Sequence, residues 1–168
     1  MVAEGLTVDV AAREGGVNDD ALATIRSQFD ALTFLAESAR EGRDLSVHFI
    51  RELHVALCRE QQTYEARNAL AQVFQAPRQH GQWKMQPNHV RRPDGTLMEY
   101  VPPEHVQIEM ERLIAFYQAA QGIHPLVRAA WLHHAFILIH PFEGGNGRVA
   151  RALATHPSSW TDSLAAVT

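Results

Sequence analysis

Cysteine and lysine are nearly missing from this chain of 168 residues. Cys58 is the single cysteine, so no disulfide framework exists and we expect a reducing compartment, the cytoplasm. Lys84 is the single lysine, and the other basic side chains are arginines, which suit bidentate contacts with phosphate or carboxylate. The formal net charge of −4 gives no general electrostatic attraction for nucleic acid.

Long apolar runs are missing as well. The most hydrophobic stretch, residues 129–142, is too short and too rich in histidine to span a bilayer. The first residues lack the basic patch and apolar run of a secretory signal, so we expect no membrane partner. Hydrophobic residues still make up 46% of the sequence, which is ample for one sizeable core.

Helical spacing of apolar residues predicts one mainly α-helical domain over residues 20–155. Residues 1–19 are polar and contain glycine, so we expect a loose N-terminal segment. After Ala154 the apolar pattern ends, and residues 156–168 form an atypical C-terminal tail interrupted by Pro157. A missing helix there predicts a marginally stable or partner-dependent product.

Three helices are predicted in the first half of the domain. The first begins at Asp20 and ends at Gly42. The second can be capped by either Asp44 or Ser46. The third covers residues 66–75.

Residues 77–103 differ in kind, because they contain five prolines and broken apolar patterning. Asp94 and Gly95 form a favoured tight-turn pair between the extended runs 89–92 and 96–101. The segment therefore predicts a small β-hairpin that lies as a flap on the helical body.

Two further helices follow, the first beginning before Glu104 and the second at Pro125. The second is apolar on nearly all sides towards its end, and we expect it to be central and buried. The first presents an apolar face made of Val106, Met110, Leu113 and Tyr117. The second presents a stripe made of Leu126, Ala129, Ala130, His133, Phe136 and Ile137.

The segment HPFEGGNGRVAR, residues 140–151, comes directly after this buried helix. Pro141 stops the helix at His140, and the glycines allow a tight turn into a new helix, whose bare N–H groups attract phosphate. Arg148 and Arg151 can add charge-assisted contacts to the same anion. The imidazole of His140 can accept a proton from an incoming hydroxyl.

Each of these features alone also fits an ordinary structural role, but their order after a buried helix favours a phosphate-handling site. Other candidate residues receive structural interpretations. Adjacent His133 and His134 point to different helix faces, so no metal pair is predicted. His54, Trp131 and Cys58 are expected to serve the core or its edges.

The segment resembles the signature of Fic domains: His, any residue, Phe, any residue, Asp or Glu, Gly-Asn-Gly-Arg, two residues, Arg. Residues 81–113 resemble the flap of Fic domains and the helix after it, and residues 50–54 resemble an earlier helix. The resemblance covers roughly residues 44–154. It implies a Fic-like helical bundle with a small β-hairpin flap, which transfers AMP from ATP to a hydroxyl side chain of a target protein and releases pyrophosphate.

Carried over by position, the resemblance makes His140 the general base and Phe142 the anchor of the loop. The target protein would present an extended segment that pairs with the flap by strand addition. The implied nucleotide-binding residues are Gly145, Asn146, Gly147, Arg148 and Arg151.

One position departs from the signature. Gly144 stands where Fic domains carry the carboxylate that holds Mg²⁺ on the phosphates, so turnover should fall heavily. Glu143 is either a replacement ligand or a solvated loop carboxylate. Three interpretations stay open: a weakened adenylyltransferase, a catalytically inactive Fic-like module that binds nucleotide or target, and an enzyme that handles another phosphate-containing group.

Many Fic domains are silenced by a helix that bears Ser or Thr, three residues, Glu, and then Gly or Asn. Residues 33–38 match this spacing, with Ser38 in place of the final Gly or Asn. We expect instead that Phe34 and Leu35 pack into the core, which leaves a separate inhibitor protein as an open alternative.

Overall fold

The structure, a computed structural model, describes residues 19–67, 72–92 and 94–155. The predicted N-terminal segment up to residue 18 and the predicted tail from residue 156 lie outside the described residues. The helices are α2 (Asp19–Arg40), α3 (Val47–Cys58), α4 (Pro103–Ala119), α5 (Pro125–Ile139) and α6 (Asn146–Ala154). The strands are β1 (Thr63–Arg67), β2 (Val73–Pro77), β3 (Val90–Arg91) and β4 (Leu97–Met98).

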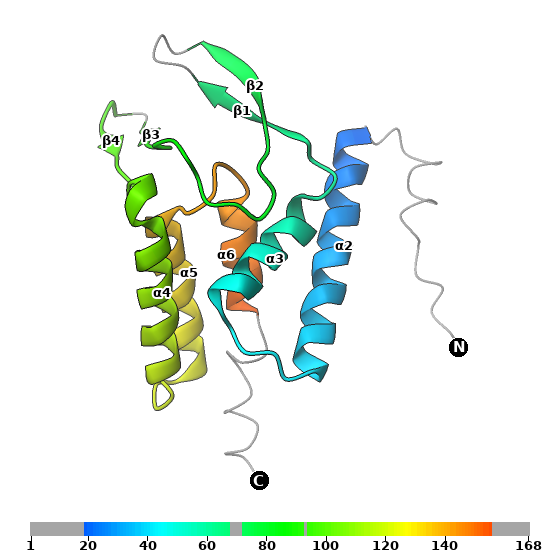
Figure 1. Cartoon of the computed structure of the whole chain (residues 1–168), viewed down its shortest axis with the longest axis vertical. Helices are drawn as coiled ribbons and strands as arrows, with labels where there is room; N and C mark the ends of the chain where they lie inside the picture. The colour runs from blue at the N-terminus through cyan, green and yellow to red at the C-terminus, as the bar shows by residue number, and fades with distance from the viewer. Residues whose placement is uncertain (1–18, 68–71, 93, 156–168) are drawn as a thin grey trace.

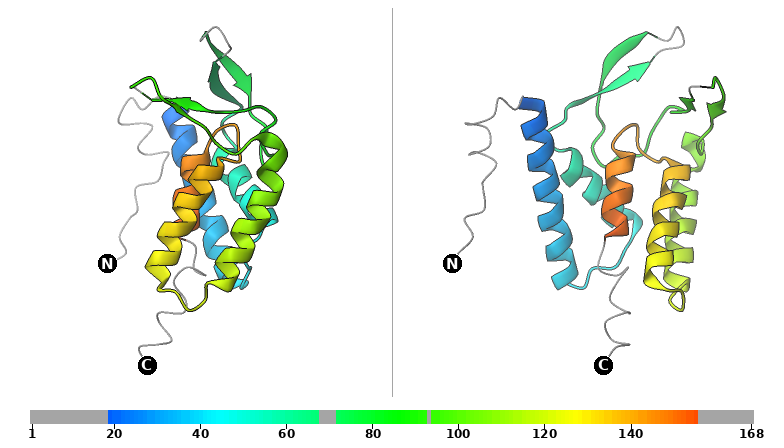
Figure 2. Two further views of the ribbon diagram at one scale, coloured as in Figure 1. Left: turned by 90° about the vertical axis from the view of Figure 1, so that its left-hand side faces the viewer. Right: turned by 180° about the vertical axis from the view of Figure 1, so that it is seen from behind.

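Helix α6 lies between two pairs of helices, α2 with α3 on one side and α4 with α5 on the other (Figures 1 and 2). Both β-hairpins lie at one end of this bundle, and the loop between α5 and α6 turns at the same end. The predicted class, a mainly α fold with a small β-hairpin, is confirmed. No helix among the described residues is both long and apolar enough to cross a membrane.

The first two helices end and begin at the predicted signals. Gly42 adopts a left-handed conformation with φ 64° after α2, and the N–H of Arg43 returns to the carbonyl of Ser38 at 2.9 Å. Ser46 caps α3, because its hydroxyl accepts the N–H of Phe49 at 3.1 Å. Of the two predicted caps, Ser46 is therefore the one used.

A β-hairpin replaces the helix that the sequence predicts over residues 66–75, so that prediction was wrong. Strands β1 and β2 are antiparallel, with Thr63 opposite Pro77 and Arg67 opposite Val73. Aromatic and β-branched residues favour this pairing, and Ala76 is the only residue of β2 that is buried. The hairpin thus projects from the body, and its own ladder of hydrogen bonds holds it together. The spacing of apolar residues along the chain therefore does not predict its conformation.

The predicted flap is confirmed, although its strands are only two residues long. Val90 pairs with Met98 and Arg91 pairs with Leu97 in an antiparallel sheet. At the turn, the Asp94 carboxylate accepts both the N–H and the hydroxyl of Thr96, at 2.9 and 2.6 Å.

Helix α4 buries the predicted face, but α5 turns a different stripe inward. Leu126 is 53% exposed and Ala130 is exposed, which corrects two members of the predicted stripe. Because α5 is apolar on nearly all sides, the spacing of its apolar residues does not identify the buried face. The inward residues of α5 that are apolar and follow Pro125 are Ala129, Leu132, Phe136 and Ile139.

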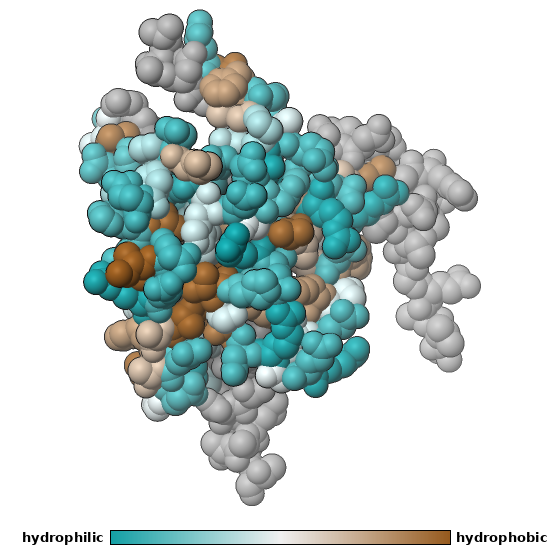
Figure 3. Space-filling model, in the orientation of Figure 1, coloured by the Kyte–Doolittle hydropathy of each residue, from teal (hydrophilic) through white to brown (hydrophobic). Residues whose placement is uncertain are grey.

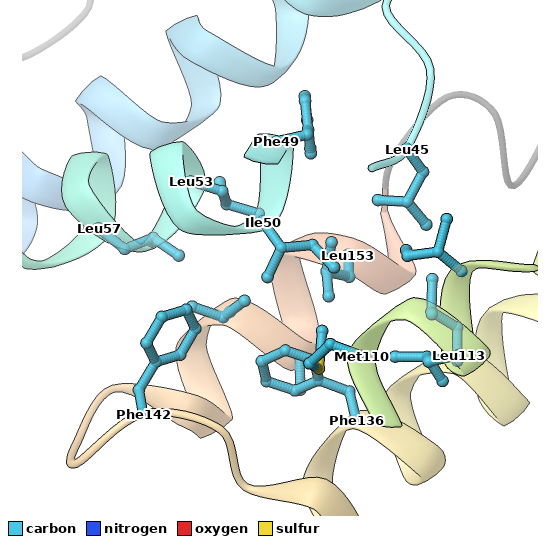
Figure 4. Close-up of a cluster of buried hydrophobic side chains, with 14 of the residues drawn as sticks. Leu45, Phe49, Ile50, Leu53, Leu57, Met110, Leu113, Phe136, Phe142 and Leu153 are labelled. Atoms are coloured by element: carbon cyan, nitrogen blue, oxygen red, sulfur yellow. The ribbon is translucent and has the colours of Figure 1, made fainter. Parts of the chain in front are cut away.

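The core joins α3, α4, α5 and α6 to the loop that precedes α6. Figure 4 shows the ring of Phe142 pointing from this loop into the interior, towards side chains of α3 and α5. Phe142 is 1% exposed, and its ring centroid lies 6.3 Å from that of Phe136. Figure 3 shows that the surface seen from this side is mainly hydrophilic, with several hydrophobic patches on it. Core packing therefore reaches directly into the loop that the sequence marks as functional.

Candidate active site

The loop between α5 and α6 begins and ends at residues with left-handed backbones. His140 caps α5 with φ 52° and ψ 58°, and its N–H donates to the carbonyl of Phe136 at 3.0 Å. Gly145 caps α6 with φ 85°. A non-glycine residue in this region carries backbone strain, so the turn at His140 has to be held by its surroundings.

The side chain of Asn146 holds the loop closed. It is buried, its Oδ1 accepts the N–H of Phe142 at 2.9 Å, and its Nδ2 donates to the Phe142 carbonyl at 2.7 Å. Asn88, which precedes strand β3 of the flap, donates to the same carbonyl at 2.8 Å. Because the side chain of Asn146 is used in this way, only its backbone N–H is available to bind an anion.

His54 fixes the loop from α3, a role that agrees with its structural interpretation from sequence. Its Nδ1 accepts the N–H of Gly81 at 2.9 Å, so Nε2 carries the proton and donates to the Gly144 carbonyl at 3.0 Å. The ring also stacks on Phe142 with centroids 3.8 Å apart. Burial lowers the pKa of His54 to about 4, so this histidine is neutral and ties the base of the flap to the loop.

Lys84 forms a second tie between the flap and the loop. Its backbone N–H donates to the carbonyl of Pro141 at 2.8 Å, and its ammonium donates to Oδ1 of Asn88 at 2.7 Å. The residue is 2% exposed, and burial lowers its pKa to about 8. The one lysine of the chain is thus a buried support behind His140.

The imidazole of His140 lies under the aromatic ring of Tyr100, with centroids 4.0 Å apart. Its Nδ1 lies 3.3 Å from the carbonyl of Ile137. Because a carbonyl can only accept, Nδ1 carries the proton and Nε2 keeps its lone pair. Burial, together with the charge of Lys84, lowers the pKa of His140 to about 4. The ring is therefore neutral near pH 7 and can receive a proton at Nε2.

Three backbone N–H groups are available at the start of α6. Those of Gly145, Asn146 and Gly147 donate to no residue in the part of the chain that the structure describes. They stand at the positive end of the helix dipole, and such a terminus favours a bound anion. These three main-chain donors lie where the sequence predicts an anion nest.

The two predicted arginines have different surroundings. Arg148 donates from Nη1 to the Leu57 carbonyl at 2.9 Å and from Nη2 to the Gln61 side chain at 2.6 Å, so it also ties α6 to the end of α3. A Cβ placed on Gly145 would lie 3.5 Å from Nη2 of Arg148. Arg151 is exposed, and its Nη1 would lie 3.5 Å from a Cβ on Gly147. Both guanidinium groups therefore reach the glycines of the nest, although Arg148 also donates a hydrogen bond to the end of α3.

Arg78, which follows β2 and reaches the loop, carries no signal in the sequence that points to the site. A Cβ placed on Gly144 would lie only 2.7 Å from Nη1 of Arg78. Arg78 also lines a polar pocket of about 460 Å³ at the end of α3, together with Gln61 and Tyr64. The nearby Glu143 carboxylate adds to burial in raising the pKa of the Tyr64 hydroxyl.

These residues do not fit the divalent metal that the resemblance implies. Gly144 has no side-chain ligand, and the guanidinium of Arg78 occupies the space where one would begin. Within residues 19–67, 72–92 and 94–155, no group of three or more histidine, cysteine, aspartate or glutamate residues could hold a metal ion.

The comparisons with known proteins agree with this geometry. The model of the Fic/DOC family matches residues 34–157. A Fido domain-containing protein of Dictyostelium discoideum is 41% identical over 58 residues, which cover 33% of this chain and 41% of that protein. The protein adenylyltransferase fic-1 of Caenorhabditis elegans is 38% identical over 55 residues, covering 32% of this chain and 11% of that enzyme.

Solved structures show the same fold. A Fic domain-containing signalling protein of Bacteroides thetaiotaomicron superposes with a TM-score of 0.70 at 27% identity, covering 89% of this chain and 53% of that one. Residues 134–508 of the C. elegans protein give a TM-score of 0.63 at 23% identity, covering 86% of this chain and 39% of that one. The chain thus spans from about a tenth to about half of the length of these relatives. With most of its length matched by the family model and the signature loop folded around Asn146, this chain belongs to the Fic/DOC family.

Proposed function

We propose that the chain transfers AMP from ATP to a hydroxyl side chain of a target protein, at a rate reduced by Gly144. The observation that carries this proposal is the neutral imidazole of His140, with its Nε2 lone pair free, at the rim of a loop with three unpaired N–H groups. The base and the anion site are thus adjacent. The names of the curated relatives support the reaction class.

The reaction assigns a separate task to each part of the site. The hydroxyl oxygen of the target bonds to the α-phosphorus of ATP, and its proton passes to Nε2 of His140. The bond from that phosphorus to the bridging oxygen breaks, and pyrophosphate leaves with the electron pair. The amides of the nest and the guanidinium groups of Arg148 and Arg151 stabilise the phosphate charge.

The flap supplies the binding surface for the target. Each of its two strands has one partner among the described residues, so each leaves an outer edge unpaired. An extended segment of the target can add to such an edge through main-chain hydrogen bonds. Tyr100, two residues after β4, stacks on His140, so a segment held by the flap lies near the base.

The test uses ATP labelled in turn at the α- and γ-phosphates. We expect label from α-labelled ATP alone, on the chain itself or on hydroxyl-containing peptides, because AMP transfer keeps only the α-phosphate. His140→Ala should remove the label. His134→Ala, an exposed histidine of the same helix, should keep it. Equal labelling by the parent and His140→Ala would contradict the proposal.

A second candidate is a catalytically inactive module that binds nucleotide or the target strand. Gly144 favours it, since the position offers no metal ligand, and so does Arg148, whose guanidinium is partly used by α3. In the labelling experiment this candidate predicts no label from the parent and label from Gly144→Asp in the presence of Mg²⁺ or Mn²⁺.

A further inference from the structure

Arg78 is anchored at the base of the β1–β2 hairpin and extends towards the signature loop. Its N–H donates to the carbonyl of Gln62 at 2.8 Å, and Nη2 lies 3.4 Å from the carbonyl of Thr63. These contacts hold Arg78 at its backbone and at Nη2 of its guanidinium group. The guanidinium group also faces Gly144, where a Cβ would lie 2.7 Å from Nη1 and 3.3 Å from Nη2.

Two nitrogen atoms of this guanidinium lack acceptors. Nε and Nη1 of Arg78 are buried and make no hydrogen bond with any described residue. A buried donor without an acceptor is costly, and more so on a charged group. An anion beside Gly144 would give Nη1 an oxygen acceptor, because the edge formed by Nη1 and Nη2 is one of the two edges of the arginine fork that match phosphate.

The surroundings of Arg78 carry charges of both signs, because Arg148 adds positive charge and the Glu143 carboxylate favours the charged guanidinium. Burial lowers the pKa of Arg78, and the neighbouring Arg148 lowers it further. Nη2 of Arg148 approaches the adjacent Gly145, at 3.5 Å from the position of a Cβ. Two guanidinium groups therefore flank consecutive glycines of the loop, next to the three unpaired amides of the nest.

Gly144 and Arg78 depend on one another. Any side chain at position 144 would meet Nη1 of Arg78 at less than 3.0 Å, so one of the two would have to move. A carboxylate there would pair with the guanidinium and consume its charge. The position that lacks a metal ligand is thus the position that a cationic side chain covers.

We propose that Arg78 binds the phosphates of the nucleotide beside Gly144 and supplies the positive charge that a divalent metal would otherwise provide, so that binding does not require a metal. This inference rests on the proposed function, since it assumes that the loop holds a nucleotide. It adds Arg78, a residue outside the signature, to the nucleotide-binding residues, and it means that nucleotide binding needs no divalent cation.

The test measures ATP binding by calorimetry in EDTA and again in Mg²⁺. We expect the parent affinity in EDTA to lie within about twofold of that in Mg²⁺, and Arg78→Gln to weaken it at least about tenfold, as loss of a charge-assisted contact should. Arg112→Gln removes the same charge from an exposed site on α4 that pairs with Glu109 and should leave the affinity unchanged.

Two further variants test the interpretation. Gly144→Asp should lose affinity in EDTA and regain it with Mg²⁺, because its carboxylate pairs with Arg78 or with the metal. Arg78→Lys should fall between the parent and Arg78→Gln, and it carries the test if Arg78→Gln fails to fold by circular dichroism. Metal-dependent binding by the parent, or unchanged binding by Arg78→Gln, overturns this inference and leaves the proposed function standing. No ATP binding in either condition overturns both.

Discussion

His54 offers the sharpest test of how the flap and the signature loop are joined. His54→Phe keeps a ring that can stack on Phe142 but removes both ring nitrogens. The N–H of Gly81 and the carbonyl of Gly144 then lose their partners in a buried position. Each unpaired group costs about 1–3 kcal/mol, so the free energy of unfolding should fall by about 2–5 kcal/mol.

The same residue predicts a change in stability with pH, whose sign follows from its pKa. The folded-state pKa of His54 is about 4, below the ordinary value of 6.5. As the pH falls through 6.5, the unfolded chain binds a proton that the folded chain refuses, so stability decreases down to about pH 4. Between pH 6.5 and about pH 5 this contribution amounts to about 2 kcal/mol.

The assay is urea denaturation near neutral pH and near pH 5. The parent should lose about 2 kcal/mol more than His54→Phe does over this interval, since His140 contributes equally to both. His48→Phe on the same helix is the matched control, because the His48 side chain is 77% exposed and its Nε2 lies 3.6 Å from the Glu52 carboxylate. Equal pH dependence in the parent and His54→Phe, or equal stability of the two phenylalanine variants, would refute the reasoning.

Three further predictions concern the loop and its supports. Asn146→Ala removes two buried hydrogen bonds to Phe142 and should lower the free energy of unfolding by about 2–4 kcal/mol in urea titrations; a loss below about 0.5 kcal/mol would show that the loop closes without it. Ser46→Ala removes the cap of α3 and should cost about 1 kcal/mol in the same assay, whereas an unchanged midpoint would speak against the cap. Tyr100→Ala uncovers His140, and the pKa of His140, about 4 in the parent, should then rise towards 6.5. An NMR titration of the ring protons of His140 measures this pKa, and an unchanged value would mean that another group buries the imidazole.

Local signals in the sequence located the helices around the site. Pro125 and Pro141 bracket α5, Ser46 caps α3, and Gly42 closes α2, because proline and capping residues act within one turn of the backbone. Helical spacing also identified the buried face of α4. The bundle and its signature loop could therefore be predicted before any coordinates.

The β1–β2 hairpin and the supports of the loop could not be predicted in this way. Among the described residues of the range 66–75, Ala66 and Arg67 belong to β1 and residues 73–75 belong to β2, and their strand conformation comes from the pairing of these two strands. Nothing local assigns Arg78 to Gly144 or His54 to Gly81. These contacts join positions far apart in the chain, which periodicity and capping rules do not see.

That distance has a consequence for how the site assembles. The partners that clasp the loop come from 52 to 91 positions away: Asn88 for the carbonyl of His140, His54 for that of Gly144, and the Leu57 carbonyl for Arg148. Closing such wide chain loops is entropically expensive and slow. The loop between α5 and α6 should therefore gain its shape only when α3, the flap and α6 have all come together. Hydrogen exchange at the buried N–H groups of Gly81 and Phe142, which donate to His54 and Asn146, should report global rather than local opening.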